Sequence, residues 1–223
     1  MHPWWPLADL RLRTPRLELR LPDDADLDAL ASLAAAGVHD EAVQPFAVAW
    51  TDVPPAERAR SVLQFHWAQR GAWRPGAWSL DLVVVRDRIV VGTQGISGRD
   101  FARLREVSTG SWLGRSYHGQ GFGTEMRAAV LELAFTGLDA EYALSGAFAD
   151  NLASLAVSRK LGYQRDGIER IVRRGVPADS VRLRLDRPGS EASRTVPVRL
   201  DGLEPCLPLF GLGPDQGAGP GGS

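Results

Sequence analysis

The sequence has little cysteine, little lysine and no long hydrophobic run. Cys206 is the single cysteine among 223 residues, which excludes an internal disulfide and a cysteine-based zinc site. Lys160 is the single lysine. No apolar stretch approaches the roughly 18 residues that span a membrane, and residues 1–6 lack the charged start and apolar centre of a signal peptide. We therefore expect a cytoplasmic protein.

The charge balance gives no reason to expect nucleic acid or a membrane as a partner. The formal net charge is −1, from 27 acidic and 26 basic residues, and this balance favours neither nucleic acid nor an anionic membrane as a partner. The hydrophobic fraction of 44% is that of an ordinary globular protein. The length suits one large domain or two small ones. Because almost all the basic residues are arginine, we expect a GC-rich, bacterial coding sequence.

What the sequence does contain is a glycine-rich segment at residues 112–126. An apolar strand leads into it, three alternating glycines occupy residues 119–123, and a helix follows at once. A helix start lined by glycines exposes unpaired backbone N–H groups and the positive end of the helix dipole. Such a site binds an anion, most often phosphate, because no side chain blocks the approach to the backbone. The segment therefore predicts a phosphate-binding loop.

Three kinds of phosphate loop can be compared with this segment. The Walker-type loop requires a lysine after its glycines, and none follows here, so that loop is excluded. The dinucleotide pattern G-x-G-x-x-G is matched at Gly119 and Gly121 but not at Thr124, although Asp139 lies near the distance expected for the residue that binds the ribose. No succession of βαβ units follows, which counts against a dinucleotide site.

The third comparison extends well beyond the loop. Residues 118–125 resemble the acyl-CoA pyrophosphate loop of the GCN5-related N-acetyltransferases (GNAT), although His118 stands where that family usually has Arg or Gln. Residues 151–163 resemble the family's second motif, an asparagine-led helix that runs into a strand. Residues 14–20 resemble the first strand of the branch that includes the ribosomal-protein N-terminal acetyltransferases (RimJ/RimL-like). Together the resemblance covers about residues 10–187.

The remaining elements agree with the order β-α-α-β-β-β-α-β-α-β-β of that family. Hydrophobic patterns, caps and breakers predict strands at 10–21, 78–86, 89–96, 107–113, 142–148, 163–174 and 180–186, and helices at 23–36, 54–70, 124–135 and 152–160. The resemblance implies an α/β GNAT fold with a mixed, mostly antiparallel sheet of six to seven strands. The fourth and fifth strands would splay apart, and about four helices would flank the sheet.

Three regions are expected along the chain. Residues 1–9 form an N-terminal arm, whose Trp4 and Trp5 pack on the domain or, as the alternative, on a second copy in a homodimer. Residues 10–187 form the acyltransferase domain. Residues 188–223 are rich in proline and glycine, and we expect a mobile tail there.

The resemblance also assigns residues to the cofactor, acetyl-CoA or another acyl-CoA such as succinyl-CoA. It implies that the backbone of Trp112 and Leu113 faces the pantetheine arm, that Asn151 lies near the pantetheine, and that Ser154 lies near the pyrophosphate or ribose. A plain helix cap is the structural alternative for Asn151. The phosphate loop needs no metal, and its implied pyrophosphate contacts are His118, Gly119, Gln120, Gly121, Phe122, Gly123 and Thr124.

Acyl transfer to an amine requires a neutral amine, stabilisation of the oxyanion and a partner for the leaving thiolate. Many relatives supply a tyrosine to the thiolate four residues after the serine of the second motif, and Ser158 occupies that position here. Glu106, near the start of the fourth strand, is the candidate base, with an exposed strand-edge glutamate as the alternative. The family's segment between the first two helices arches over the acceptor cleft. The acceptor candidates are His39, Phe46, Trp50 and His66.

We therefore expect an N-acyltransferase that moves an acetyl, succinyl or other acyl group from CoA to a primary amine of a small molecule or a protein N-terminus. Direct attack in a ternary complex is the expected route, because proximity supplies much of the rate. The alternative is a non-catalytic acyl-CoA-binding module, which the departures at Ser158 and His118 motivate. The sequence does not select the amine.

Overall fold

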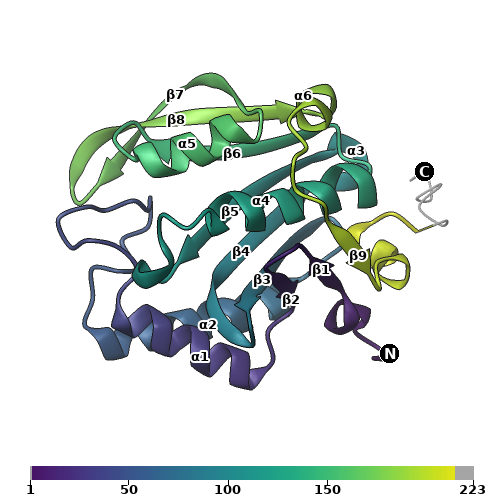
Figure 1. Ribbon diagram of the computed structural model, residues 1–223, viewed down its shortest axis with the longest axis horizontal. Helices are drawn as coiled ribbons and strands as arrows, with labels where there is room; N and C mark the ends of the chain where they lie inside the picture. The colour runs from purple at the N-terminus through teal and green to yellow at the C-terminus, as the bar shows by residue number, and fades with distance from the viewer. Residues whose placement is uncertain (1, 214–223) are drawn as a thin grey trace, which may run out of the picture.

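A computed structural model, shown in Figure 1, describes residues 2–213. They form one continuous sheet with helices on both of its faces. The strand order is β7-β8-β6-β5-β4-β3-β2-β1-β9, and among these described strands only the β5–β6 pair is parallel. The strands are β1 Arg11–Arg13, β2 Glu18–Arg20, β3 Ala77–Arg86, β4 Ile89–Arg99, β5 Glu106–Leu113, β6 Tyr142–Phe148, β7 Gln164–Arg173, β8 Val176–Asp186 and β9 Arg199–Asp201. The mixed, mostly antiparallel sheet is therefore confirmed.

The four predicted helices are present and cover both faces of the sheet. Helices α1 and α2 pack on one face, and α4 and α5 pack on the other (Figure 1). The α-helices are α1 Asp24–Ala36, α2 Pro55–Ala72, α3 Phe101–Leu104, α4 Phe122–Glu132, α5 Leu152–Lys160 and α6 Arg187–Ala192. The short 3-10 and π turns are η1 Pro6–Asp9, η2 Arg115–Tyr117, η3 Leu133–Gly137 and η4 Glu204–Phe210.

The two faces of the sheet explain why its central strands read as continuous apolar runs. Successive side chains of a strand point to opposite faces. In β3, Leu82 and Val84 belong to the core under α4, whereas Val83 and Val85 belong to the smaller core under α1 and α2. Burial on both faces leaves no position for an alternating polar residue.

The chain ends differ from expectation. The predicted first strand is divided at the turn around Pro15 into β1 and β2, and β9 pairs with β1, which brings the sheet to nine strands. Cys206 and Phe210 are fully buried against the domain. Packing against the domain therefore continues past Arg187 as far as the described residues reach. The expectation for residues 214–223 lies outside the described residues.

The N-terminal arm packs on the domain through its 3-10 turn. Leu7 is fully buried, and the ring of Trp5 meets that of Trp73 edge-on at 5.7 Å between centroids. Trp4, by contrast, is 86% exposed. Among residues 2–213, no helix is long and apolar enough to cross a membrane.

Gly92 allows β4 to approach β5 closely, and it predicts a large effect on stability. A Cβ at Gly92 would lie 2.3 Å from the carbonyl oxygen of Trp112. Because the backbone of Trp112 cannot move aside as a side chain can, we expect Gly92→Ala to lower the free energy of unfolding by about 1–3 kcal/mol. Urea titration measures this change. Gly76→Ala is the matched control, since a Cβ there meets open space. Equal stability of the two variants would contradict the close approach.

Candidate active site

Strands β5 and β6 separate after a short parallel pairing. They are paired only at Glu106↔Tyr142, Val107↔Ala143 and Ser108↔Leu144. Beyond Ser108, β5 continues with β4 as its only neighbour in the described residues, while β6 continues beside β8. The predicted splay is therefore present. It leaves one edge of β5 with backbone groups that can bond a ligand.

A cavity of about 630 Å³ lies between the splayed strands and the starts of α4 and α5, and we call it the loop cavity. It contains all the predicted cofactor residues except Gln120. Those that line it are Trp112, Leu113, His118, Gly119, Gly121, Phe122, Gly123, Thr124, Asn151 and Ser154. Gln120 points elsewhere, since its side-chain amide donates to the carbonyl of Ser116 and its own carbonyl accepts from Arg16.

The glycine loop presents a row of free donors to this cavity. Gly119 and Gly121 have φ angles of 73° and 82°, in the left-handed region that glycine adopts without strain. Among residues 2–213, the backbone N–H groups of residues 119–123 have no acceptor. The N–H of Thr124, by contrast, donates to the carbonyl of Gly121 at 3.2 Å. The loop and the start of α4 therefore form an anion site of backbone donors.

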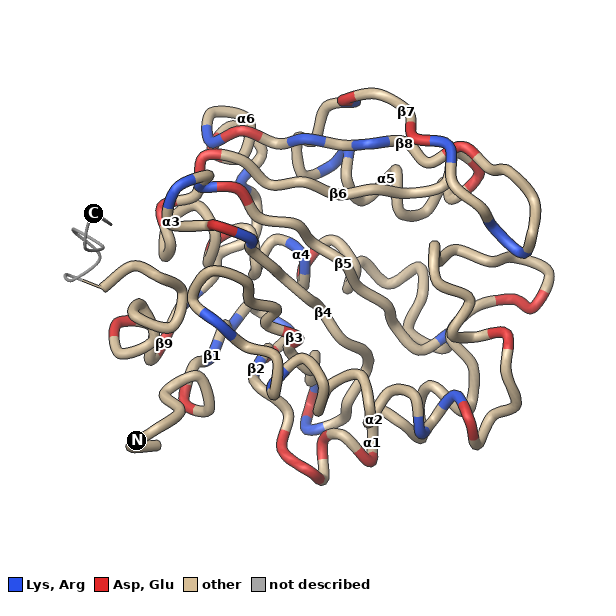
Figure 2. Tube along the Cα trace, turned by 180° about the vertical axis from the view of Figure 1, so that it is seen from behind, with Lys and Arg blue, Asp and Glu red and all other residues tan. Residues whose placement is uncertain are grey.

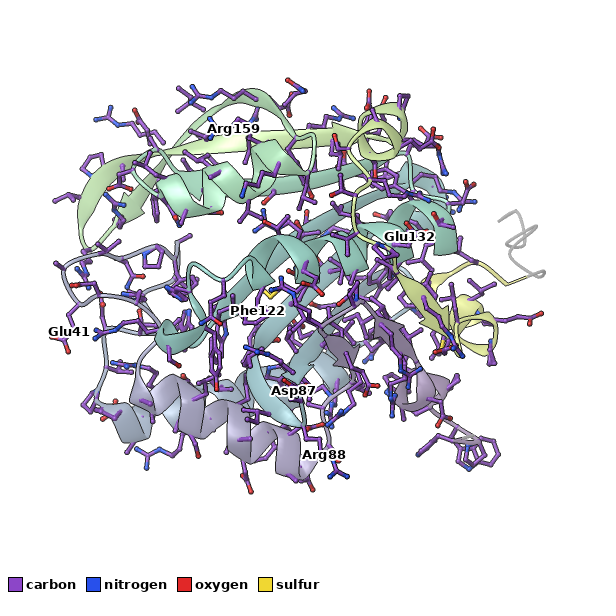
Figure 3. The ribbon with its side chains drawn as sticks, viewed as in Figure 1. Glu41, Asp87, Arg88, Phe122, Glu132 and Arg159 are labelled. Atoms are coloured by element: carbon purple, nitrogen blue, oxygen red, sulfur yellow. The ribbon has the colours of Figure 1, made fainter. Side chains whose placement is uncertain are left out.

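The buried carboxylate of Glu125 ties this loop to the turn between β1 and β2. It accepts hydrogen bonds from Thr14 Oγ1 at 2.6 Å, from the N–H of Arg16 at 3.0 Å and from Arg16 Nε at 2.6 Å. The Arg16 guanidinium also lies 4.6 Å from the ring centroid of Phe122, which Figure 3 labels at the start of α4. Two motifs that are more than a hundred positions apart thus form one unit.

His118 and Asn151 line the loop cavity and also make hydrogen bonds within the protein. His118 Nε2 donates to the carbonyl of Leu113 at 3.1 Å, so the ring joins the loop to the end of β5. Asn151 Oδ1 accepts from the N–H of Ser154 at 3.1 Å and caps α5. Asn151 is therefore a helix cap and a wall of the cavity at once.

A second cavity, of about 790 Å³, lies under α2, and we call it the α2 cavity. Its walls come from α2, β3, β4, β5 and the loop before α2. Both cavities include Phe46 and residues 109–112 of β5. They therefore meet along the same stretch of β5, beside the splay.

The walls of the α2 cavity are mainly apolar and aromatic. Phe46, Trp50 and Trp112 form a continuous row, with ring centroids 5.2 and 5.5 Å apart. Residues 89–98 and 107–113, the parts of β4 and β5 that border this cavity, carry no charged side chain, as Figure 2 shows. The row of aromatic rings, with no charged side chain on the facing parts of β4 and β5, favours an apolar ligand body.

Three of the four predicted acceptor residues line the α2 cavity. These are Phe46, Trp50 and His66. His39 lies instead on the loop cavity, and its two ring nitrogens contact the carbonyl of Asp40 and the hydroxyl of Thr51, each at 2.8 Å. These bonds hold the loop together, and the His39 ring lies 5.6 Å from the ring of Phe46, which lines both cavities, so a role as an acceptor contact stays a prediction.

Asp81 is the acidic residue of the α2 cavity, and the sequence patterns did not single it out. It lies opposite Gly95 in β4, which lies opposite Gly110 in β5. A Cβ at Gly95 would be 2.6 Å from Asp81 Oδ1, whereas one at Gly110 would meet open space. Because Gly95 and Gly110 have no side chains, the surface between the Asp81 carboxylate and β5 is open. Burial raises the pKa of Asp81 to about 6, although the Ser79 hydroxyl donates to it at 2.8 Å.

His66 is the other titratable group of the α2 cavity. Burial, with a further contribution from the Arg70 charge, lowers the pKa of His66 to about 4. The ring is therefore neutral between about pH 5 and 8. A change of activity with pH in that range therefore does not come from His66.

The two predicted catalytic residues lie outside both cavities. Glu106 is at the closed end of the splay, 3.5 Å from Arg184, and corresponds to the strand-edge alternative. Ser158 is fully buried behind the wall, where its hydroxyl donates to the carbonyl of Ser154 at 3.0 Å and accepts from Arg127 Nη1 at 2.8 Å. Arg127 does line the loop cavity.

The turn between β7 and β8 closes over the loop before α2. The Arg174 guanidinium makes a two-pronged contact with Asp52, at 2.6 and 2.7 Å, and also donates to the carbonyl of Glu41. Hydrogen bonding from Arg174 is the main cause that lowers the pKa of Asp52 to about 2.

Within residues 2–213, no three His, Cys, Asp or Glu side chains lie close enough together to hold a metal ion.

Comparison with known proteins identifies the family. A model of the acetyltransferase (GNAT) domain matches residues 16–164, more than half of the chain. The chain therefore belongs to the GNAT family and is an N-acyltransferase.

Two solved structures illustrate the shared fold. Mycobacterium smegmatis RimJ in complex with CoA-disulfide is 24% identical, with a TM-score of 0.67 over 84% of this chain and 91% of that one. A RimL ribosomal L7/L12 alpha-N-protein acetyltransferase in complex with coenzyme A is 18% identical, with a TM-score of 0.62 over 78% of this chain and 95% of that one. At these identities the likeness establishes the fold.

Proposed function

We propose that the protein transfers an acetyl or other acyl group from CoA to a primary amine by direct attack in a ternary complex. Acyl-CoA would lie in the loop cavity and the acceptor in the α2 cavity. The observation that carries this proposal is that both cavities share residues 109–112 of β5. A thioester beside the splay and an amine under α2 would meet there.

The loop cavity fits a CoA ester. Five free backbone N–H groups at residues 119–123 match the oxygens of a pyrophosphate and need neither lysine nor metal. The unpaired edge of β5 offers strand-like hydrogen bonds to the amides of a pantetheine arm. When bound, the cofactor supplies an acyl group activated as a thioester.

The α2 cavity fits an amine with an apolar body. Its aromatic walls would hold that body, and the Asp81 carboxylate would bind the ammonium group. Above about pH 6, Asp81 is ionised and can accept the proton that the amine must lose before it attacks. Asp81 thus takes the role first considered for Glu106. The acceptor is either a small apolar amine or a protein N-terminus with an apolar first residue. Separately, the exposed side chain of Trp4 offers a contact for a homodimer.

Calorimetry followed by an amine screen tests this proposal. We expect acetyl-CoA or succinyl-CoA to bind and NAD, the dinucleotide control, not to bind. Apolar primary amines should then release free CoA thiol in the presence of the protein. Binding of NAD alone would overturn the proposal. Binding of CoA esters without thiol release from any amine or N-terminal peptide would instead favour the non-catalytic acyl-CoA-binding module.

Asn151→Ala is expected to affect stability and cofactor affinity together. Loss of the cap on α5 should lower the free energy of unfolding by about 1 kcal/mol, and the altered wall should weaken acetyl-CoA binding. Chemical denaturation and calorimetry measure the two effects. Asn151→Ser retains a capping oxygen and should recover the stability but not the full affinity. Wild-type affinity in Asn151→Ala would show that Asn151 is a cap alone.

A further inference from the structure

Arg127, in the second turn of α4, is a buried cation without an anionic partner. Its side chain is 5% exposed, and it forms no ion pair with any acidic residue in the described part of the chain. Nη1 donates to Ser158 Oγ at 2.8 Å, while Nε is buried and has no hydrogen-bond partner within residues 2–213. An uncompensated buried charge costs several kcal/mol by order of magnitude, so this arrangement points to an anion that arrives with a ligand.

The groups around Arg127 leave its charge intact. Burial lowers its pKa, but a guanidinium remains protonated under physiological conditions. Burial also raises the pKa of Tyr163, so that phenol stays neutral, and its hydroxyl is shared with Thr109 at 3.2 Å. Ser158 is a neutral hydroxyl. No group that faces Arg127 from α5, β5 or the start of β7 therefore carries a negative charge.

The position of Arg127 separates it from the phosphate site. It lies five residues after Phe122, about 7.5 Å further along the helix axis. It lines the loop cavity together with Thr109 and Gly110 of β5 and with residues 145–146 of β6, where the two strands begin to separate. The phosphate donors are therefore at the outer end of the cavity and this cation is at the inner end.

We propose that Arg127 stabilises the CoA thiolate that leaves during acyl transfer, and that Ser158 is a positioning residue that holds its guanidinium. The inference rests on the proposed function. The amine nitrogen forms a bond to the acyl carbon, the carbon–sulfur bond breaks, and its electron pair stays on sulfur. Asp81 takes the proton that converts the bound ammonium group to a neutral amine and passes it to solvent. It then takes the second proton, which the nitrogen loses as the amide forms. Arg127 keeps its own protons and offsets the charge on sulfur, which solvent protonates after release. A fixed cation thus replaces the tyrosine that many relatives use.

The pKa of the thiol of bound CoA tests this inference without any acceptor. Free CoA and the protein–CoA complex would be titrated by the ultraviolet absorbance of the thiolate. In the wild-type complex we expect the thiol pKa to fall by at least about one unit, a tenfold larger thiolate-to-thiol ratio, as it does for thiols beside cations. Arg127→Met should return it to the value of free CoA, Arg127→Lys should retain part of the shift, and Ser158→Ala should give an intermediate value.

The outcomes separate the two proposals. If calorimetry shows no CoA binding, the proposed function fails. If CoA binds but its thiol titrates as in free solution, the role of Arg127 fails. If Arg127→Met loses affinity for succinyl-CoA but not for acetyl-CoA, and the thiol pKa is unshifted, Arg127 binds an acyl carboxylate and the inference is overturned.

Arg127→Met should remain folded, because it removes an unpaired buried charge and leaves Ser158 its bond to Ser154. We expect its melting temperature without ligand to equal or exceed that of the wild type. Should it fail to fold, the wild-type thiol titration and the Arg127→Lys and Ser158→Ala variants still decide the question.

Discussion

Asp81→Asn is expected to lower kcat/KM for the amine acceptor by about 100-fold or more, since general-base catalysis contributes on that scale. The amide can neither bind an ammonium group as an anion nor accept its proton. Acetyl-CoA affinity should stay unchanged, because Asp81 lies in the α2 cavity and not in the loop cavity. Steady-state kinetics with the best amine, together with calorimetry, separates the two effects. Full activity of Asp81→Asn would remove this residue from the mechanism.

The pH dependence of Asp81 provides an independent check. Its pKa is raised from 3.8 to about 6, so the folded state holds this proton more tightly than the unfolded state. Stability therefore falls as pH rises through that window, and Asp81→Asn should be more stable than wild type by about 1–3 kcal/mol near pH 8 and equal near pH 3. The wild-type rate should rise as pH passes about 6, and Asp81→Asn should lack this rise. Glu106→Gln is the control and should leave the rise in place.

Gly123→Glu is expected to weaken acetyl-CoA binding by about 3–4 kcal/mol, roughly 100-fold or more, because a carboxylate beside the free N–H groups repels the pyrophosphate. A negative charge in the first turn of a helix favours the fold, so stability should be unchanged or slightly higher. Calorimetry and thermal melting together test this combination. Lost affinity with lost stability would indicate simple misfolding.

Gly123→Ala is the matched control. Its added Cβ would lie 3.7 Å from Val157 Cγ2 and 4.0 Å from Leu113 Cδ1, which are ordinary van der Waals distances. We therefore expect wild-type stability and nearly wild-type affinity. If Gly123→Glu also binds acetyl-CoA normally, the loop at residues 119–123 is not the pyrophosphate site.

The parts of the site that depend on local backbone geometry could be predicted from the sequence. A phosphate loop requires glycines directly before a helix, and the second motif requires an asparagine cap, so both are visible as short patterns around Gly121 and Asn151. The fold followed from the resemblance that these two patterns and the first strand carry together. The glycine loop and the first-strand motif are also in contact in the structure, because Glu125 accepts hydrogen bonds from the turn at residues 14–16.

The parts that depend on register between distant strands could not be predicted. Asp81 stands in an apolar run, and its access to β5 depends on two glycines that face it only after β3, β4 and β5 have paired. Glu106 is on the expected strand but at its closed end.

Composition did not reveal how the C-terminal segment packs. Its prolines and glycines suggested mobility, yet apolar residues between them, such as Phe210, are buried on the core. Only the pairing of β9 with β1 and the packing of η4 reveal that this segment belongs to the domain.

Amide hydrogen exchange with and without acetyl-CoA tests the central claim most directly. The N–H groups of residues 119–123 have no acceptor in the described chain, so they should exchange quickly in the free protein. Acetyl-CoA should slow exchange at these residues and along the free edge of β5 at residues 109–113. Unchanged exchange at residues 119–123, under conditions where calorimetry shows saturation with acetyl-CoA, would contradict the proposed binding site.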